Sequence, residues 1–171
     1  VGREVSFKTD KKAANPQEIV LSVENLVVKE NRGIEAVKNL SLEVRAGEIL
    51  GIAGIDGNGQ SELIQALTGL RKVESGHIYL GGDEITNLRP RKITEAGVGH
   101  VPEDRHKYGL ILEMTLAENI ALQTYYQEPM SQMGVLNYGE INDHACDLIK
   151  EFDVRTVSEV VPAKALSGGN Q

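Results

Sequence analysis

The stretch Gly54-Ile55-Asp56-Gly57-Asn58-Gly59-Gln60-Ser61 decides the fold of this chain. Its spacing, G-x-x-x-x-G-x-S, is that of a phosphate-binding loop. The apolar residues 49–53 precede it and predict a strand, and residues 62–67 continue as a helix. Glycines let backbone N–H groups turn around phosphate oxygens, and the N-terminus of a helix favours anions. The pattern therefore predicts a strand–loop–helix unit that binds phosphate.

One position of the loop departs from the usual pattern. A lysine that reaches the β- and γ-phosphates normally precedes the serine, and here Gln60 takes its place. Glutamine donates hydrogen bonds but carries no charge, and a charge-assisted bond is roughly twice as strong as a neutral one. Two interpretations remain open. Either the loop holds phosphate weakly, or Gln60 is simply a tolerated substitution.

The composition is that of an acidic globular protein. Its 171 residues suffice for one domain with a hydrophobic core, and 40% of them are apolar. The net charge of −7 argues against a general nucleic-acid binder, which needs a basic surface. No run approaches the roughly 18 apolar residues of a membrane span. Cys146 is the single cysteine of this sequence, which excludes a disulfide within it.

The pattern along the chain predicts a core followed by a helical part. Residues 1–18 are polar and predict a linker, residues 19–109 an α/β core, and residues 110–171 a helical subdomain. We expect an N-terminal antiparallel β part and an incomplete parallel sheet within the core. Strands are predicted at residues 19–28, 36–44, 49–53, 77–80 and 98–101, and helices at residues 62–68, 90–96, 115–126 and 137–152.

Local signals mark the starts of the last two helices. Thr115 and Glu118 have the spacing of a capping box, and Asn137 stands three residues before Glu140 in the same way. The final helix is expected to bury one apolar stripe, which consists of Ile141, Ala145, Leu148, Ile149 and Phe152.

Five segments follow one another in a fixed order: 54–61, 96–105, 109–110, 117–119 and 166–171. In this order and spacing they resemble the ATP-binding subunit of an ATP-binding cassette (ABC) transporter. Leu-Ser-Gly-Gly-Asn-Gln at 166–171 is similar to the signature motif of bacterial sugar and nucleoside importers. Pro-Glu-Asp-Arg at 102–105 resembles the second of two cassettes fused in one polypeptide, and residues 1–5 resemble the end of the first.

The resemblance implies a P-loop NTPase core of the ABC type. Residues 1–18 then correspond to the linker from the preceding cassette. The family's pattern continues past the signature with an acidic strand end that holds Mg²⁺ and with a switch histidine. Because the sequence stops at Gln171, we expect a fragment that ends at the signature motif and is inactive in isolation.

The resemblance also assigns roles in the loop. Gly57 and Gly59 cradle the β-phosphate of ATP with neighbouring amides, and the Ser61 hydroxyl binds Mg²⁺. The full set of nucleotide-binding residues expected is Gly54, Asp56, Gly57, Asn58, Gly59, Gln60, Ser61 and Glu62.

Glu103 is the catalytic candidate that the resemblance gives. It stands where the family has the glutamine that touches Mg²⁺ and relays the state of the site to the helical subdomain. A carboxylate there still binds Mg²⁺ but repels a γ-phosphate. Together with Gln60, this departure predicts a degenerate nucleotide site.

The signature is expected to act in trans. In the family, two cassettes pair head to tail, and each signature caps the nucleotide that the opposite loop holds. The residues concerned here are Ser167, Gly168, Gly169 and Gln171, with Ser167 as the N-cap of a helix that points at the γ-phosphate. An intact signature beside a poor loop implies one competent site and one degenerate site per pair.

Several residues keep an alternative interpretation. Asp104 and Arg105 also fit an ordinary solvated ion pair at a strand end. The family's adenine-stacking aromatic residue is absent from residues 29–33, where Arg32 fits a solvated turn better than a stacking role. His100 and His106 lack carboxylate or cysteine partners at metal-binding spacing, so no ligand role is assigned to them.

The leading hypothesis is the ATP-binding, energy-coupling component of an ABC importer for simple sugars or nucleosides. It implies ATP and Mg²⁺ as cofactors and a peripheral location on the cytoplasmic face of the cell membrane. The implied partners are the first cassette of the same polypeptide, the membrane permease subunits and, indirectly, a solute-binding protein, with no nucleic acid. The alternative is a non-catalytic nucleotide-binding and dimerisation module that docks on the permease. An ABC ATPase acting on DNA or ribosomes is disfavoured by the acidic charge.

Overall fold

The structure is a computed structural model that describes residues 13–171. It forms two compact units that divide between Gly99 and His100, and each is described by itself. Residues 1–12 of the predicted linker lie outside the described residues, and residues 13–18 are exposed and contain no strand or helix. The functional boundary predicted between residues 109 and 110 stays a prediction.

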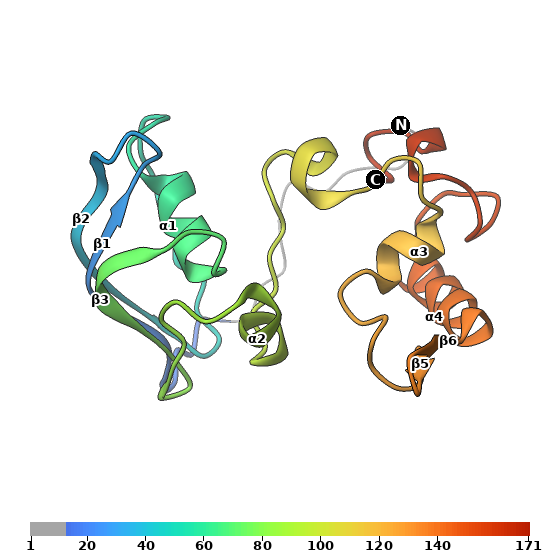
Figure 1. The fold of residues 1–171 in the computed structure, drawn as a ribbon, viewed down its shortest axis with the longest axis horizontal. Coiled ribbons are helices and arrows are strands. Elements are labelled where there is room, and N and C mark those ends of the chain that lie inside the picture. Colours follow the sequence, from blue (N-terminus) through green and yellow to red (C-terminus); the bar gives the residue numbers. More distant parts are fainter. Residues whose placement is uncertain (1–12) are drawn as a thin grey trace. The chain divides into compact units, whose positions relative to one another are not determined.

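Antiparallel strands form the sheet of the first unit (Figure 1). The strands are β1 (Ile19–Lys29), β2 (Glu35–Arg45), β3 (Val73–Leu80) and β4 (Asp83–Glu84), in the spatial order β2-β1-β3-β4. Val23 in β1 lies opposite Leu42 of β2 and Ile78 of β3. The N-terminal antiparallel β part predicted from the sequence is therefore present.

A tight turn joins β3 to β4, as predicted. Gly81 and Gly82 have φ angles of 59° and 92°, the left-handed backbone that a two-residue hairpin turn of type I′ requires. Tyr79 pairs with Glu84 and Leu80 with Asp83 across this turn.

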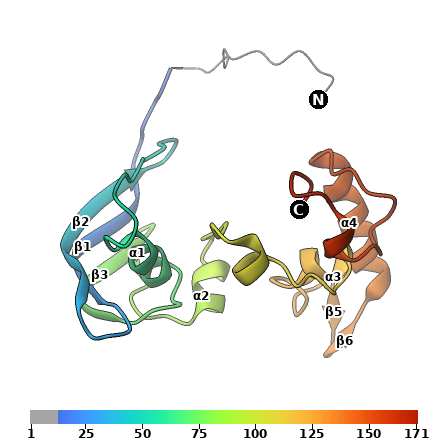
Figure 2. The same ribbon diagram turned by 90° about the horizontal axis from the view of Figure 1, so that it is seen from above.

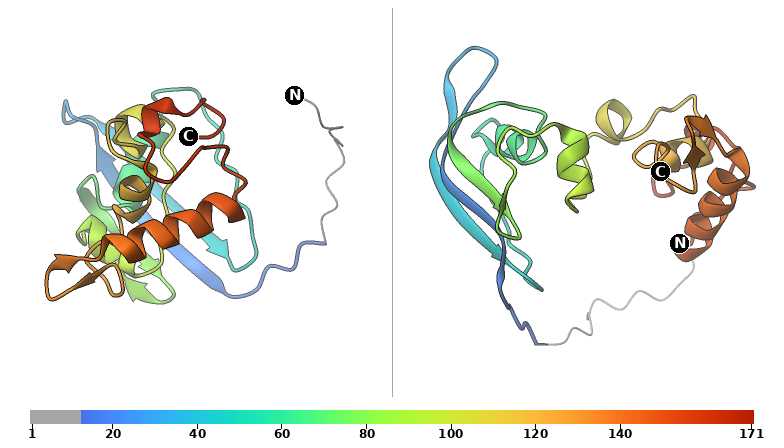
Figure 3. Two further views of the ribbon diagram at one scale, coloured as in Figure 1. Left: turned by 90° about the vertical axis from the view of Figure 1, so that its right-hand side faces the viewer. Right: turned by 60° about the horizontal axis from the view of Figure 1, so that its bottom comes forward.

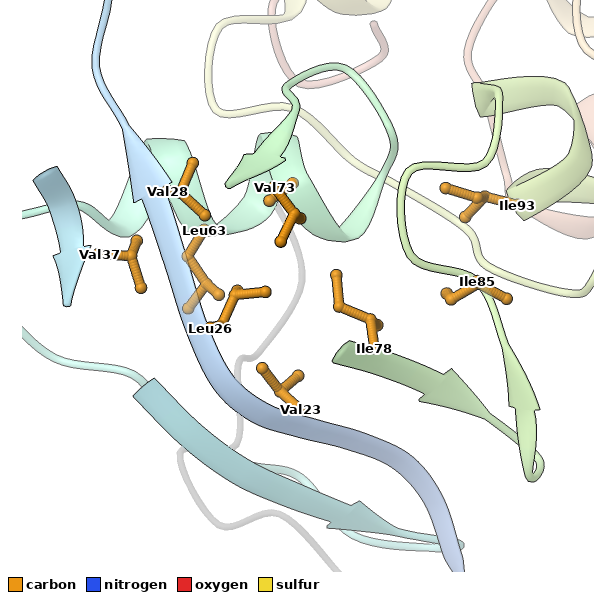
Figure 4. Close-up of a cluster of buried hydrophobic side chains, with 10 residues drawn as sticks. Val23, Leu26, Val28, Val37, Leu63, Val73, Ile78, Ile85 and Ile93 are labelled. Carbon is orange, nitrogen blue, oxygen red and sulfur yellow. The ribbon is translucent and has the colours of Figure 1, made fainter. Parts of the chain in front are cut away.

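Helix α1 (Gln60–Leu67) lies against one face of the sheet (Figure 2). Its Leu63 and Ala66 are buried in a core with side chains from the strands. The sheet contributes Val23, Leu26, Val28, Val37, Val73 and Ile78, which are labelled together with Leu63 in Figure 4. Each such side chain stabilises the fold by about 1.5–3 kcal/mol when fully buried. This packing fixes the position of α1, and with it the loop that precedes the helix.

Helix α2 (Pro90–Glu95) has Pro90 at its first position, as the sequence predicts. Its Ile93 is 2% exposed and joins the same core. The helix therefore belongs to the first unit.

Two predicted strands of the parallel sheet are wrong. Residues 49–53 and 98–101 have no regular secondary structure, and Ile49 and Val101 are 98% and 94% exposed. A strand forms when its N–H and C=O groups pair with a neighbour. Among residues 13–171 the sheets contain only antiparallel pairs, and neither stretch joins them.

The second unit is mainly helical. Its elements are η1 (Arg105–Gly109), α3 (Leu116–Ala121), β5 (Ser131–Gln132), β6 (Val135–Leu136), α4 (Tyr138–Glu151) and η2 (Ala163–Ala165). Helix α4, orange and seen along its length in the left panel of Figure 3, packs on α3. The contact buries the small side chains of Ala117, Ala121 and Ala145. The helical character predicted for this part is confirmed.

The helix starts were predicted correctly and one helix end was not. Thr115 and Glu118 form the reciprocal capping box, and the Asn137 side chain accepts a bond from the N–H of Glu140. Helix α3 ends at Ala121 and not near residue 126, because the next bonds include shorter turns such as Thr124 N–H to the Ala121 carbonyl. Phe152 is 71% exposed, since it lies past the last helical residue of α4 and leaves the apolar stripe.

Candidate functional site

The C-terminal end of the phosphate loop is held against the sheet. Gly59 is the N-cap of α1, is buried and has a φ angle of 99°. A Cβ atom at this position would meet the carbonyl oxygen of Ala36 in β2. Only glycine tolerates both this backbone and this close approach. The N–H of Leu63 then bonds the Gly59 carbonyl at 2.9 Å and closes the first helical turn.

The middle of the loop is an exposed turn. Gly57 has a φ angle of 83° and open space around it, and the N–H of Asn58 bonds the carbonyl of Ile55 at 3.2 Å. Asp56 and Asn58 are both exposed. The left-handed glycines turn the chain back toward α1, as a phosphate cradle requires.

The helix supplies donors at this end. Gln60, Ser61 and Glu62 form its first residues, and N–H groups in the first turn of a helix have no helical acceptor. Such groups, with the positive end of the helix dipole, stabilise a bound phosphate. Ser61 is exposed and Glu62 half-buried, so the serine hydroxyl is accessible from solvent.

The side chain of Gln60 folds back across the loop. Its amide nitrogen Nε2 lies where a Cβ atom on Gly54 would be, and Cδ lies 3.0 Å from the same point. Because Gly54 has no side chain, the Gln60 amide can lie in this space. Gln60 stands at the sequence position of the motif's lysine and brings no charge to the loop.

The donor set for Mg²⁺ consists of oxygen atoms. The Ser61 hydroxyl and the Glu103 carboxylate are both exposed and are hard ligands of the kind Mg²⁺ prefers. Ser61 belongs to the first unit and Glu103 to the second. Among residues 13–171 no group of three or more His, Cys, Asp or Glu residues is placed to hold a metal. Taken singly, each of these oxygens is a ligand type that fits Mg²⁺, and bound nucleotide phosphates would supply further oxygens.

The segment around Glu103 is ordered by its neighbour. Asp104 caps the short π-helical turn η1, and its Oδ1 accepts from the N–H groups of His106 at 3.0 Å and Lys107 at 3.1 Å. The Asp104–Arg105 ion pair considered from the sequence is absent from the described residues. Arg105 instead donates to the side chain of Gln171.

The signature residues form one hydrogen-bonded turn. The Ser167 carbonyl accepts from the N–H groups of Asn170 at 2.8 Å and Gln171 at 3.2 Å. The Ser167 hydroxyl accepts from the Asn170 side chain at 3.0 Å, and the Asn170 Oδ1 accepts from the N–H of Arg155 at 3.1 Å. The Ser167 hydroxyl thus contacts the side chain of Asn170 in this turn, and its role as a helix N-cap stays a prediction. Gly168 and Gly169 are exposed at the surface of the turn.

Gln171 connects this turn to η1. Its Oε1 accepts from Arg105 Nε at 3.2 Å and lies 2.8 Å from His106 Nε2. Its Nε2 donates to the carbonyl of Ala163 at 3.1 Å. Sequence reasoning missed these contacts, because 65 and 66 residues separate the partners and no local pattern reports them.

Backbone hydrogen bonds hold residues 159–163, the segment that precedes the signature turn. The N–H groups of Leu116 and Ala117, which begin α3, bond the carbonyls of Val161 and Glu159, each at 3.0 Å. In return the Ala163 N–H bonds the Met114 carbonyl at 3.0 Å. The Leu166 side chain is 9% exposed and packs with Leu116 and Ala163. Helix α3 thereby anchors the segment that leads into the signature.

The turn between β1 and β2 carries no aromatic side chain. The Arg32 guanidinium bonds both carboxylate oxygens of Glu30, at 3.1 Å and 3.2 Å. Arg71 bonds the Lys29 carbonyl at 2.9 Å and the Asn31 side chain at 3.1 Å, and thereby ties the turn to the end of α1. Arg32 is thus an exposed turn residue, as favoured from the sequence, and its pairing with Glu30 was not predicted. The anchoring role of Arg71 was not predicted.

The structure groups the predicted residues in two sets. The loop residues 54–62 lie together in the first unit, and Glu103 lies with the signature residues 167–171 in the second unit. Within residues 13–171, no helix combines the length and the apolar character needed to cross a membrane.

The family model described as ABC transporter matches residues 37–171, the part that holds both the loop and the signature. The chain belongs to the ABC transporter family. The resemblance drawn from the sequence motifs is therefore confirmed. Since the family's cassettes share the P-loop NTPase fold, the predicted fold class is confirmed as well.

The curated relatives are ATP-binding proteins of importers. The chain is 64% identical to the nucleoside import ATP-binding protein NupA of Lactococcus lactis subsp. cremoris and covers 34% of it. It is 61% identical to the guanosine import ATP-binding protein NupO of Bacillus subtilis and again covers 34%. With the glucose import ATP-binding protein TsgD13 of Haloferax volcanii it shares 43% identity and covers 31%. These matches take in 99–100% of this chain, which spans about a third of each relative's length.

Solved ABC cassettes show the same fold. A nucleotide-free ATP-binding cassette from an ABC transporter aligns with a TM-score of 0.71 at 23% identity, over 89% of this chain and 60% of that one. A dimeric cassette bound to ADP and phosphate aligns with a TM-score of 0.68 at 22% identity, over 88% and 64%. At these identities the likeness concerns the fold alone.

Proposed function

We propose that this chain is the ATP-binding, energy-coupling part of an ABC importer for simple sugars or nucleosides. Family membership supports the class of component. The names of the relatives at 64% and 61% identity, which refer to nucleoside and guanosine import, favour a nucleoside as the transported solute. The activity belongs to the whole protein, because the chain spans about a third of the length of these relatives.

Within that protein, this part has a degenerate phosphate loop and donates its signature motif to the partner site. One observation carries this proposal. The neutral Gln60, whose amide lies against Gly54, stands at the lysine position of the loop, while residues 167–171 form a hydrogen-bonded turn. A neutral donor stabilises the charge of a transferring phosphoryl group less than a lysine does.

The chemistry assigned to the residues is electrostatic. Bound Mg²⁺ neutralises phosphate charge, and Ser61 and Glu103 offer the oxygen ligands that would hold it. Backbone amides at Gly57 and Gly59 bind the β-phosphate of ATP in this loop. Ser167, Gly168 and Gly169 place hydroxyl and amide donors at the γ-phosphate held by the partner cassette. Donors fixed before the reaction stabilise developing charge without reorganisation.

The proposed partners follow from these separate roles of the phosphate loop and the signature. A first cassette of the same polypeptide supplies the competent phosphate loop, and membrane permease subunits receive the coupled motion. A solute-binding protein acts only indirectly, through the permease. The chain is then a peripheral component on the cytoplasmic face of the membrane.

The alternative function is a non-catalytic module that binds nucleotide, dimerises and docks on the permease. The uncharged Gln60 and the acidic Glu103 favour it, because both weaken hydrolysis at this chain's own loop. We also infer that residues 1–171 alone do not turn over ATP. Measurement of phosphate release tests this inference, and turnover that Gln60→Ala abolishes would contradict it.

Uptake measurements test the importer function. The gene is deleted, and uptake of labelled nucleosides and labelled simple sugars is followed with and without the restored wild-type gene. We expect the deletion to abolish uptake of one of these solute classes, and the gene with Ser167→Arg to fail to restore it. Normal uptake of both classes in the deletion strain would contradict the proposal.

A further inference from the structure

Two consecutive residues of η1, Arg105 and His106, contact the signature turn through their side chains. Gln171 accepts hydrogen bonds from Arg105 at 3.2 Å and from His106 at 2.8 Å on the same oxygen atom, Oε1. The Gln171 nitrogen faces the Ala163 carbonyl, which only accepts, and this fixes the orientation of the amide. The Nε2 atom of His106 therefore faces the oxygen of this amide. The Arg105 bond is charge-assisted and is the stronger kind.

Arg105 also touches the turn directly. Its Nη2 lies 2.6 Å from the point that a Cβ atom on Gly168 would occupy. The missing side chain of Gly168 thus lets the guanidinium lie against the backbone of the turn. Two residues of the signature, Gly168 and Gln171, meet the same arginine.

Other contacts of the signature turn are a bond from the backbone of Arg155 and a bond between two residues of the turn. Asn170 accepts from the N–H of Arg155 at 3.1 Å and donates to the Ser167 hydroxyl at 3.0 Å. The contacts from η1 differ because they come from side chains. They depend on the conformation of residues 103–106, which Asp104 caps.

We propose that Arg105, with His106, is a positioning residue for the signature turn. Through Gln171 and Gly168 the pair holds the turn in the conformation that presents Ser167 and Gly169 to the partner's nucleotide. This inference rests on the proposed function of the signature. It gives Arg105 a role that neither a solvated ion pair nor a Mg²⁺ ligand would have.

The test is steady-state ATP hydrolysis by the full-length gene product assembled with its permease. Arg105→Ala and Gln171→Ala are each expected to lower kcat about tenfold, the effect of one charge-assisted bond. KM stays unchanged, because ATP first binds to the partner's loop. The double variant Arg105→Ala/Gln171→Ala is expected to lose much less than the product of the two single losses, since both substitutions remove the Arg105–Gln171 bond.

The controls separate positioning from folding. Arg155→Ala removes the same charge near the same turn but keeps the backbone N–H that bonds Asn170, so kcat is expected to stay at the wild-type value. Arg105→Lys keeps a charged donor and is expected to recover part of the lost rate. Thermal midpoints measured for all variants show whether a loss of rate reflects unfolding.

Two results would overturn the inference alone. One is an unchanged kcat in Arg105→Ala, and the other is a double variant whose loss is the product of the two single losses, about 100-fold. Ser167→Arg measured in parallel identifies the other kind of failure. If that variant still hydrolyses ATP at the wild-type rate, the proposed function of the signature is wrong and the inference falls with it.

Discussion

At the scale of single residues, Gln60 determines what the phosphate loop can do. Its neighbours keep the features of the cradle, with left-handed backbone at Gly57 and Gly59 and an exposed hydroxyl at Ser61. The Gln60 amide lies beside Gly54, in space that a side chain at Gly54 would take. The glycine turn of the loop is therefore present, while the loop lacks the positive charge of a lysine.

Replacing Gln60 by lysine is expected to tighten nucleotide binding. A regained charge-assisted bond is worth about 1.5–3 kcal/mol, which corresponds to roughly tenfold or more in affinity. Isothermal titration calorimetry with ATP on both forms measures the difference. Ile64→Lys adds the same charge on the exposed side of α1 and serves as the control. Equal affinities of the wild type and Gln60→Lys would show that another group already supplies the charge.

The ionisation of Glu118 makes the free energy of unfolding depend on pH. The backbone N–H and the hydroxyl of Thr115 donate to its carboxylate and lower the pKa of Glu118 below the ordinary value of a glutamate. The charged form is favoured in the folded state, so the stabilisation is complete above the ordinary pKa. It is lost as the pH falls through the lowered one.

Glu118→Gln should therefore destabilise the protein at neutral pH and cost progressively less in acid. Urea unfolding of both forms at several pH values measures the effect. Glu140→Gln is the matched control, because Glu140 occupies the same position in the first turn of α4 without a reciprocal bond to the cap. A loss of stability that is equal for the two variants, or constant with pH, would argue against the capping box as its source.

At the scale of elements, local signals allowed most of the fold to be predicted. The strands of the antiparallel part, the start of α2 at Pro90 and the caps at Thr115 and Asn137 each depend on residues close in sequence. The predicted strands at 49–53 and 98–101 failed because an apolar run becomes a strand only with a pairing neighbour. The contacts of Arg105 and His106 with Gln171 escaped prediction for a related reason, since they join distant segments.

The approach of α1 to β2 should be sensitive to Gly59. Alanine there adds the strain of a left-handed φ angle, about 1–3 kcal/mol, and a clash with the Ala36 carbonyl. Gly57→Ala provides the comparison, because Gly57 has a left-handed φ angle but open space. Urea denaturation is expected to show a larger loss of unfolding free energy for Gly59→Ala than for Gly57→Ala. The opposite order would contradict the packing described here.

At the scale of the whole molecule, apolar side chains remain on the surface of the described chain. Ile49, Leu50 and Ile52 are 98%, 42% and 50% exposed, and Val101 is 94% exposed. These residues belong to the two stretches that the sequence predicts as strands. Exposed apolar surface of this kind is a binding surface or a source of association.

Residues 1–171 alone are therefore expected to bind a hydrophobic dye and to self-associate. Ile49→Glu should reduce both without lowering the thermal midpoint, because the side chain makes little contact with the core. Val23→Glu is the control for a core position, since Val23 is 1% exposed and its replacement should unfold the first unit. Dye fluorescence and light scattering provide the readouts, and unchanged association in Ile49→Glu would refute the assignment of the surface.

The central claim is that this part of the protein serves catalysis through its signature and not through its own phosphate loop. The most direct test is ATP hydrolysis by the full-length gene product with its permease, compared between Gln60→Ala and Ser167→Arg. The account predicts that Gln60→Ala keeps most of the wild-type rate. It predicts that Ser167→Arg loses about 10²-fold or more, the effect of removing a donor to developing charge. Loss of hydrolysis in Gln60→Ala together with a normal rate in Ser167→Arg would contradict it.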